Sequence, residues 1–393
     1  MFATLYLRLP TSNSLDNTNV PRLTLSGLND DVLREILDHL SVSVTTNYSF
    51  SRPPTTLKNL SLVNHRLRNL VVQQLFQKVT ICLSRAQLRD SKNGDWDTAR
   101  RAITTLTSNI MVLSVIKILK FDIYGNGEPE RPVSDHNMHN LVTFLTCLPN
   151  LENLSIHIPK PHIPAFQAAF RTFDSASPFI FPNIKTLVAH PLSVFLIDRC
   201  PNVERVGLQS PQWCRTTGSY DPSDVVEALR GDLKFIGKRA KHIKHFEARS
   251  RWMFYEIYDL AHAFPNLERL SMRSYGGEYC SGIGDIMTAL GENFKTLRRL
   301  DIDEAGKLRL GFHGWPPCGN MFIGPQGQEA YEEYSTAEKR AENRAAELAF
   351  RNIKSLKELW VGDFAVARKV GEEAEMKWEW TTNYDMVRGE ISR

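Results

Sequence analysis

Residue types that catalyse reactions or bind metals occur in this chain of 393 residues, but not at the spacings that such chemistry requires. The sequence contains no G-x-S-x-G, H-E-x-x-H or Walker pattern, and the segment SGIGDIM lacks the third glycine of a dinucleotide site. Its six cysteines are scattered, without a C-x-x-C pair or a Cys/His cluster at zinc spacing. We therefore expect a protein that is not an enzyme and that uses no cofactor and no metal.

Binding to another protein is the chemistry that the sequence favours. Arginine, acidic and aromatic residues recur at alternate positions of several short segments, and arginine and aromatic side chains dominate the binding energy of protein interfaces. We expect six of them to contact a target protein: Arg269, Ser271, Arg273, Arg299, Asp301 and Trp360. The alternative is that each is a solvated residue of a strand without a partner.

These residues belong to copies of a phrase that the chain repeats. Four copies carry Pro-Asn near their start, at residues 148–156, 181–189, 200–208 and 264–272. Aligned as apolar-x-x-apolar-x-apolar, the phrase occurs eight times, beginning at Ile116, Leu151, Ile184, Val203, Ile243, Leu267, Leu297 and Leu356. Its last four residues alternate as a half-buried strand does. Pro-Asn predicts a turn that the asparagine closes with its own side chain.

Helical periodicity precedes several copies of the phrase, for example at residues 134–148. One helix–turn–strand unit cannot bury its own apolar positions, whereas stacked units form a sheet with helices on its outer face. The sequence therefore predicts an α/β fold over residues 84–393, an irregular leucine-rich-repeat solenoid of short parallel strands and outer helices. An ordinary α/β domain is the alternative.

Residues 23–83 follow a different pattern, that of a small three-helix unit after an N-terminal tail at 1–22. The segment LSGLNDDVLREILDHL places apolar residues on one helix face, with Asn29 as its cap. A polar loop is expected at 41–56, and a second apolar helical run follows it. This order resembles an F-box, which opens with Leu-Pro and continues with two apolar helices. The matching residues are Leu28, Val32-Leu33, Ile36-Leu37, Leu62-Val63 and Leu67. The chain departs from the family pattern where Asn29 replaces the proline, Asn64 and His65 replace Cys-[Lys/Arg], and Leu67 replaces an aromatic residue.

The resemblance implies docking onto the adaptor Skp1 of a cullin-RING ubiquitin ligase. The residues that it implies for Skp1 binding are Leu28, Val32, Ile36, Leu37, Leu62, Val63 and Leu67. Because an F-box followed by leucine-rich repeats is a recognised family architecture, the resemblance implies the substrate-recognition subunit of an SCF-type (Skp1-cullin-F-box) ligase. Three alternatives stay open: the helical unit only caps the repeats, the chain is a leucine-rich-repeat scaffold without a ligase, or, least favoured, it is an enzyme with a site in the segment 311–327.

An insertion is expected at about 303–352, where the repeats are interrupted. Residues 311–327 are rich in glycine and proline and predict a loop, in which Trp315 and Phe322 either contact a partner or pin the loop. The segment after it predicts a helix with a narrow, alanine-rich apolar stripe that includes Tyr334 and Ala341.

The composition and net charge of the sequence limit the kinds of partner that we expect. Hydrophobic residues make up 42% and charged residues 23%, and the net charge of +4 is far from a nucleic-acid-binding composition. The N-terminus lacks a secretory pattern, and the longest apolar cluster is shorter than a membrane span. We expect an intracellular protein of the cytoplasm, the nucleus or both, with no nucleic acid and no membrane as partner.

Overall fold

The computed structural model describes most of the chain, in nine segments. They are residues 28–42, 55–82, 94–123, 135–173, 180–208, 223–275 (without 232, 234, 235 and 237–239), 279–316, 322–370 and 377–382. The tail predicted at 1–22 and most of the loop predicted at 41–56 lie outside the described residues. The chain divides into two compact units, Met1–Val71 and Val72–Arg393. Sequence reasoning had placed this division at residue 83.

The first unit is helical. It contains α1 (Asp30–Val42), α2 (Thr55–Ser61) and the first part of α3 (His65–Phe76). The predicted cap is confirmed, because Asn29 Oδ1 accepts a hydrogen bond from the backbone N–H of Asp31 at 3.2 Å. Asn64 plays the same part for α3, accepting from the N–H of Leu67 at 2.8 Å. The buried apolar residues of this unit are Leu33, Leu37, Leu57, Leu67 and Val71.

The second unit is built on a single open sheet, which has eleven strands in the part of the chain that the structure describes. The strands lie side by side in chain order; β1 to β9 are parallel, and β10 and β11 are antiparallel additions. Their bounds are β1 Lys78–Cys82, β2 Ile118–Asp122, β3 Asn153–His157, β4 Thr186–Ala189, β5 Arg205–Leu208, β6 His245–Ser250, β7 Arg269–Ser274, β8 Arg299–Ile302, β9 Glu358–Val361, β10 Ala365–Val370 and β11 Lys377–Thr382. A mixed α/β fold with a mostly parallel sheet is thus confirmed.

The eight copies of the repeated phrase form β2 to β9. Leu154 lies beside Leu187 in neighbouring strands, and Leu270 lies beside Leu300. The prediction that these leucines lie on adjacent strands of one sheet is therefore correct. The first apolar residue of every copy is buried, as are the two that follow it in the pattern. A period of two along each strand sends these side chains to one face and the polar ones to the other.

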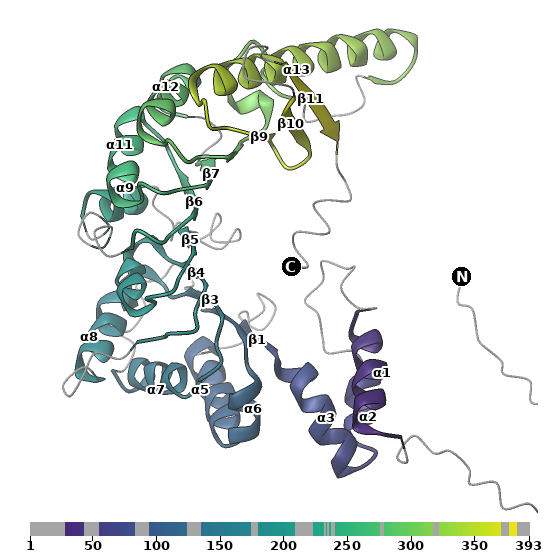
Figure 1. The fold of residues 1–393 in the computed structure, drawn as a ribbon, viewed down its shortest axis with the longest axis vertical. Coiled ribbons are helices and arrows are strands. Elements are labelled where there is room, and N and C mark those ends of the chain that lie inside the picture. The colour runs from purple at the N-terminus through teal and green to yellow at the C-terminus, as the bar shows by residue number, and fades with distance from the viewer. Residues whose placement is uncertain are drawn as a thin grey trace, which may run out of the picture. The chain divides into compact units, whose positions relative to one another are not determined.

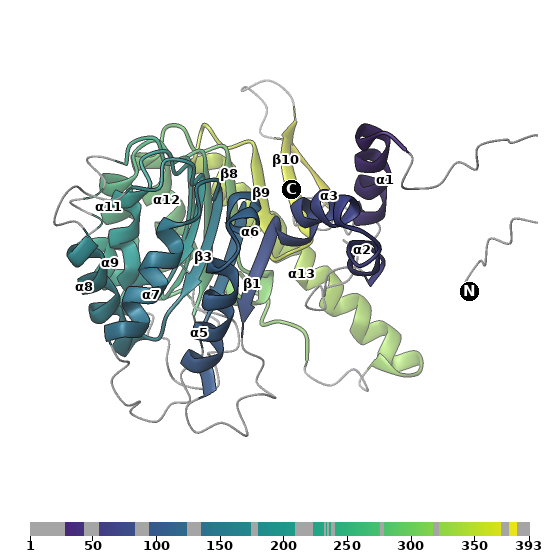
Figure 2. The ribbon, with the colours of Figure 1, turned by 90° about the horizontal axis from the view of Figure 1, so that it is seen from below.

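The helices described between the strands cover the apolar face of this sheet (Figures 1 and 2). They are α5 Gly94–Thr107, α6 Ile110–Val115, α7 Asp135–Thr146, α8 Ile163–Phe173, α9 Ser223–Arg230, α11 Phe254–Ala263 and α12 Ile283–Asn293, with the 3₁₀ segments η2 Lys160–His162 and η3 Pro191–Arg199. Their apolar sides and the inward side chains of the strands form one continuous hydrophobic core. The opposite face of the sheet carries its polar side chains.

The asparagines of the repeated phrase act differently from the prediction. The expectation that each asparagine closes its own turn is wrong, because its amide reaches the turn of the preceding copy instead. The Nδ2 of Asn183 donates to the carbonyl of Pro149 at 2.7 Å, and the Nδ2 of Asn202 donates to that of Pro182 at 2.8 Å. Asn150 makes the same bond to Ser114. Each asparagine therefore links two neighbouring units through an otherwise unused backbone acceptor.

The predicted insertion separates β8 from β9. It holds the short 3₁₀ segment η5 (Ala305–Lys307), a loop of which residues 308–316 are described, and the long helix α13 (Pro325–Asn352). The predicted alanine stripe is confirmed, since Ala341 and Ala345 are fully buried. Near the sheet, Asn343 Oδ1 accepts hydrogen bonds from the indole N–H groups of Trp378 and Trp380, at 3.3 and 2.9 Å. These bonds fasten α13 to β11.

Candidate interaction surfaces

The seven residues implied for Skp1 binding divide into two groups. Leu37 and Leu67 lie in the core of the unit and are 2% exposed, and Leu28 and Ile36 have intermediate exposure. Val32, Leu62 and Val63 are instead exposed by 44%, 69% and 65%. The resemblance had grouped all seven together, but of the seven only Val32, Leu62 and Val63 are exposed.

A charged contact joins the segments that carry the exposed apolar residues. Arg66, at the start of α3, bonds Asp30 Oδ1 at the start of α1, and it also donates to the carbonyl of Leu28 at 2.6 Å. Val32 lies in the first turn of α1, and Leu62 and Val63 lie in the turn just before α3. The bridge therefore fixes the start of α1 to the start of α3. We call Val32, Leu62 and Val63 the apolar patch.

The six residues predicted to bind a target lie on three adjacent strands. Arg269, Ser271 and Arg273 lie on β7, Arg299 and Asp301 on β8, and Trp360 on β9. The register places Arg269 beside Arg299, and it places Asp301 between Ser271 and Trp360. All six project from the face of the sheet that the helices leave open. The structure thus brings the predicted set together, and we call it the sheet-face cluster.

Asp301 is the centre of the sheet-face cluster. Its carboxylate is buried and accepts hydrogen bonds from Arg299 Nε at 2.8 Å and from Arg269 Nη2 at 3.0 Å. The guanidinium of Arg299 also lies over the ring of Trp360, 4.0 Å from its centroid, within the range of a cation–π contact. Charge-assisted bonds of this kind hold side chains in one geometry. The cluster is therefore pre-organised, and Asp301 compensates one of its three positive charges.

Arg273 joins three segments at one end of the same cluster. Its guanidinium donates to the carbonyl of Ile302 at 2.8 Å, to that of Gly362 at 3.3 Å and to Asp363 Oδ1 at 2.9 Å. Gly362 has a φ of 66°, a conformation that favours glycine. Arg273 thus fixes the turn that follows β9. On the neighbouring strand β6, burial and the charges of Arg269 and Arg205 lower the pKa of His245.

A row of charged residues that sequence reasoning missed lies at the edge of the sheet where the strands begin. Each member directly follows the first apolar residue of a phrase, and neighbours are joined by backbone hydrogen bonds of 2.8 or 2.9 Å. The row consists of Lys117, Glu152, Lys185, Glu204, Lys244, Glu268, Arg298 and Lys357. The sign alternates from the first member to the seventh. Lys117 Nζ lies 3.0 Å from Glu152 Oε1. We call this row the charge ladder.

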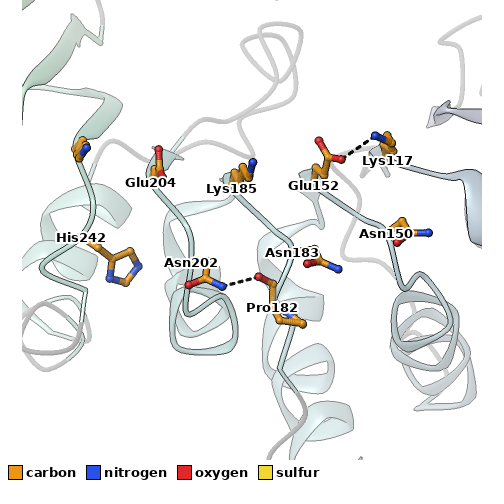
Figure 3. Close-up of a pocket in the computed structure, with 10 residues that line it drawn as sticks. Lys117, Asn150, Glu152, Pro182, Asn183, Lys185, Asn202, Glu204 and His242 are labelled. Carbon is orange, nitrogen blue, oxygen red and sulfur yellow. Dashed lines mark hydrogen bonds and ion pairs between the residues drawn. The ribbon is translucent and has the colours of Figure 1, made fainter.

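A shallow pocket of about 640 Å³ lies along the charge ladder. Figure 3 shows its charged side chains in one row and the asparagines of the repeated phrase in a second row beside them. The pocket is lined from Lys117 to Lys244. Because adjacent strands lie about 4.8 Å apart, each charge faces a neighbour of opposite sign. The lining is therefore polar but close to neutral, and the asparagine amides are engaged in the bonds between turns.

Four buried polar residues form a group near the ends of β2, β3 and β4 that lie opposite the charge ladder. They are Asp122, His157, His190 and Asp224. Asp122 Oδ1 lies 2.7 Å from His157 Nδ1, and both residues are buried. His190 follows β4, and its Nδ1 accepts from the N–H of Leu192 at 3.2 Å. Burial, together with the charges of His157 and Lys160, lowers the pKa of His190 to about 4. No sequence motif indicates this pair, because Asp122 and His157 are 35 residues apart.

Within the described segments, no group of three or more His, Cys, Asp or Glu side chains is arranged to hold a metal ion. No helix of those segments is long and apolar enough to span a bilayer. The chain matches no model of a known protein family and no curated protein. Its function is therefore argued from its own residues.

Proposed function

We propose that this chain is the substrate-recognition subunit of an SCF-type (Skp1-cullin-F-box) ubiquitin ligase. The helical unit docks onto a Skp1-like adaptor, and the polar face of the sheet binds a target protein. The chain contributes no catalytic group. Its mechanism is proximity, because a lysine of the bound target reacts at a raised effective concentration beside the ubiquitin-carrying enzyme.

The apolar patch is the observation that carries this proposal. Val32, Leu62 and Val63 are exposed, whereas Leu33, Leu37, Leu57, Leu67 and Val71 form the core of the unit. Burying one such side chain contributes about 1.5–3 kcal/mol, so three of them can supply the central contacts of an interface. A helical unit that only capped the repeats would have no reason to expose them. Their positions are also those at which the sequence resembles an F-box.

The sheet-face cluster supports the target-binding part. Ser271, Asp301 and Trp360 are buried, so the partly exposed arginines are the members that a target can contact. Arginine is a residue type that dominates interface energies, and the bonds to Asp301 hold Arg269 and Arg299 in place before a partner arrives. Side chains that are already ordered lose less entropy on binding. A protein-binding scaffold without a ligase would have the same cluster, so the two functions differ only at the apolar patch.

The test is binding to a purified Skp1 adaptor. We expect the full chain to be retained by immobilised Skp1, and expect Val32→Asp and the double variant Leu62→Asp/Val63→Asp each to weaken binding by about tenfold or more. The matched control is Ile110→Asp, which charges an apolar residue of α6 that is 80% exposed. It should bind as the wild type does.

Retention of all variants to the same extent would contradict the proposal, as would failure of the wild type to bind. If the wild type does not bind Skp1 but a target protein binds the sheet face, the chain is better described as a protein-binding scaffold without a ligase. Circular dichroism of each variant shows whether the helices remain folded.

A further inference from the structure

Five aromatic residues of the insertion form one cluster beside the N-terminal half of α13. They are Phe312, Trp315, Phe322, Tyr331 and Tyr334, and we call them the aromatic cluster. Trp315 is at its centre, with ring centroids 5.3 Å from Tyr331, 5.6 Å from Phe322 and 5.8 Å from Tyr334. Phe312 is buried and lies 6.3 Å from Trp315. The loop residues of the insertion are therefore packed on the helix.

Glycines fix the shape of the loop that carries this cluster. Gly311 and Gly314 have φ angles of 90°, and Gly324 has a φ of 82°, a region that side chains other than glycine seldom adopt. At Gly327 in α13, a Cβ would lie 2.2 Å from the carbonyl carbon of Phe322. The backbone of the loop thus touches the backbone of the helix. Such a close fit shows that the aromatic residues are held in place.

The outer side of the aromatic cluster faces solvent. Trp315 is 38% exposed, Tyr331 49% and the neighbouring Ile323 74%. This half of α13 extends past the sheet in both views (Figures 1 and 2). Packing of the loop requires only the inner rings, so the exposed tryptophan and tyrosine are available to a partner. Both residue types are enriched at interface hot spots.

Acidic side chains continue the same face of α13. Residues four and seven apart share a helix face, so Glu338 lies in line with Tyr334 and Tyr331, and Glu342 follows one turn later. Among the described residues, Glu338 and Glu342 take part in no ion pair. Burial and the charge of Glu338 raise the pKa of Glu342 to about 7. The charge of Lys339 acts in the opposite direction on that pKa, so the two carboxylates lie together with one positive charge nearby and no ion pair.

The charge of this region contrasts with that of the chain. Residues 322–342 contain five glutamates against one lysine and one arginine, a net charge of −3, whereas the whole chain carries +4. A partner for this surface must supply both positive charge and a flat group that stacks on aromatic rings. A guanidinium does both, while an ammonium group is only a point charge.

The protein itself uses this combination twice. Arg299 lies 4.0 Å from the ring centroid of Trp360 while it bonds Asp301. Arg230 lies 4.9 Å from that of Tyr255, with Asp259 at 3.7 Å. In both, an arginine lies between an aromatic ring and a carboxylate. The aromatic cluster and the two glutamates present the ring and the carboxylate without the arginine.

We propose that Trp315, Tyr331, Glu338 and Glu342 form a docking surface for a basic segment of a partner protein, with one arginine stacked on the rings and a second paired with the carboxylates. Tyr331 and Glu338 are seven residues apart, about 10 Å along the helix axis. An extended peptide spans about 10 Å in three residues, so the two arginines should be three residues apart. This surface is separate from the sheet-face cluster and goes beyond the proposed function.

The test uses the fluorescently labelled, end-capped peptide Gly-Arg-Gly-Gly-Arg-Gly and measures its anisotropy with the full chain. We expect binding that weakens by about five- to tenfold in Tyr331→Ala and in Glu338→Gln/Glu342→Gln. The peptide with lysine in place of arginine should bind several-fold more weakly, and the peptide with glutamate should not bind. The glutamine variant replaces two half-buried carboxylates by neutral groups of the same shape, so it tests the surface even where Tyr331→Ala disturbs the loop.

The matched control is Tyr258→Ala/Glu292→Gln, which removes an exposed tyrosine and the glutamate that its hydroxyl bonds at 3.1 Å, on α11 and α12. It should bind the arginine peptide as the wild type does. The proposal is overturned if the wild type does not bind the peptide at about 2 mM, a concentration above the dissociation constant of even a weak interaction. Equal binding by the wild type, the Tyr331 variant and the glutamine variant would also overturn it.

Discussion

His190 should make the folded protein sensitive to acid, because its ring is enclosed where a charge is poorly solvated. Burial is the first cause of its lowered pKa, about 4 instead of 6.5, and the charges of His157 and Lys160 add to it. Asp224 Oδ2 lies 3.7 Å from His190 Nε2 and would favour a protonated ring. The same carboxylate, however, bonds Lys160 Nζ through Oδ1 at 2.5 Å, so its attraction is already shared and desolvation dominates.

The direction of the effect follows from the two pKa values of His190. Between about pH 6.5 and pH 4 the unfolded chain holds a proton on this ring and the folded chain does not. The free energy of unfolding therefore falls as the pH drops through this window. Linkage gives a loss of about 2 kcal/mol from His190 between pH 7.5 and 5, and of about 3 kcal/mol by pH 4.

Urea unfolding of the wild type and of His190→Asn at these pH values measures the loss. An asparagine oxygen can still accept the hydrogen bond from Leu192, so the variant should fold. We expect the wild type to lose about 2 kcal/mol more than the variant between pH 7.5 and 5. The difference should persist at about 0.5 M salt, because screening weakens exposed charges far more than buried ones. Equal losses in the two proteins would refute the reasoning.

Two further substitutions test the packing of the second unit. Asp301→Asn leaves Arg269 and Arg299 without their shared carboxylate. Since both arginines are partly exposed, we expect the free energy of unfolding in urea to fall by about 2 kcal/mol, less than for a fully buried pair. A change below about 0.5 kcal/mol would show that this residue does not hold the cluster. Gly291→Ala in α12 would place a Cβ 2.1 Å from the carbonyl oxygen of Asn352 at the end of α13, so it should lower the melting temperature by several degrees. In the control variant Gly284→Ala of the same helix, the added Cβ meets nothing within 4 Å, so the melting temperature should rise slightly. A fall of equal size in both alanine variants would mean that the close approach of α12 and α13 does not limit stability.

The strands of the sheet could be predicted from the sequence because their pattern is local. Leu154 and Ile156 alternate with polar residues, and a side chain with a period of two must be buried on one face. The same phrase in eight places makes stacking the only way to bury all of them. The helix α13 was predictable for a similar reason, since its alanine stripe and its Glu347–Arg351 pair repeat at helical spacing.

The site contacts could not be predicted, because they join residues that are distant in the sequence. Arg269 and Asp301 are 32 residues apart and meet only through the register of β7 and β8. That register depends on where each strand begins, and the irregular lengths of the intervening segments hide it. The bond of Asn183 to Pro149 spans two units in the same way. Only the charge ladder left a signal in the sequence, at one fixed position of each phrase.

The alternation of the charge ladder bears on how the strands find their order. Neighbouring members such as Lys185 and Glu204 have opposite signs, so correct stacking places attraction at each step. Pairing that skipped one unit would place Lys117 beside Lys185, or Glu152 beside Glu204, and would bring like charges together. Each contact is exposed and contributes little alone. Added over six steps, the ladder favours one order of strands over those that omit a unit.

The alternation ends between Arg298 and Lys357, two like charges that directly precede β8 and β9. The insertion with α13 separates these two copies, and α13 packs its buried alanines against the core there. Packing of a whole helix contributes far more than one pair of exposed charges. The hydrophobic contacts of α13 therefore outweigh the repulsion of this one pair, and β8 and β9 stay neighbours without the help of the charge ladder.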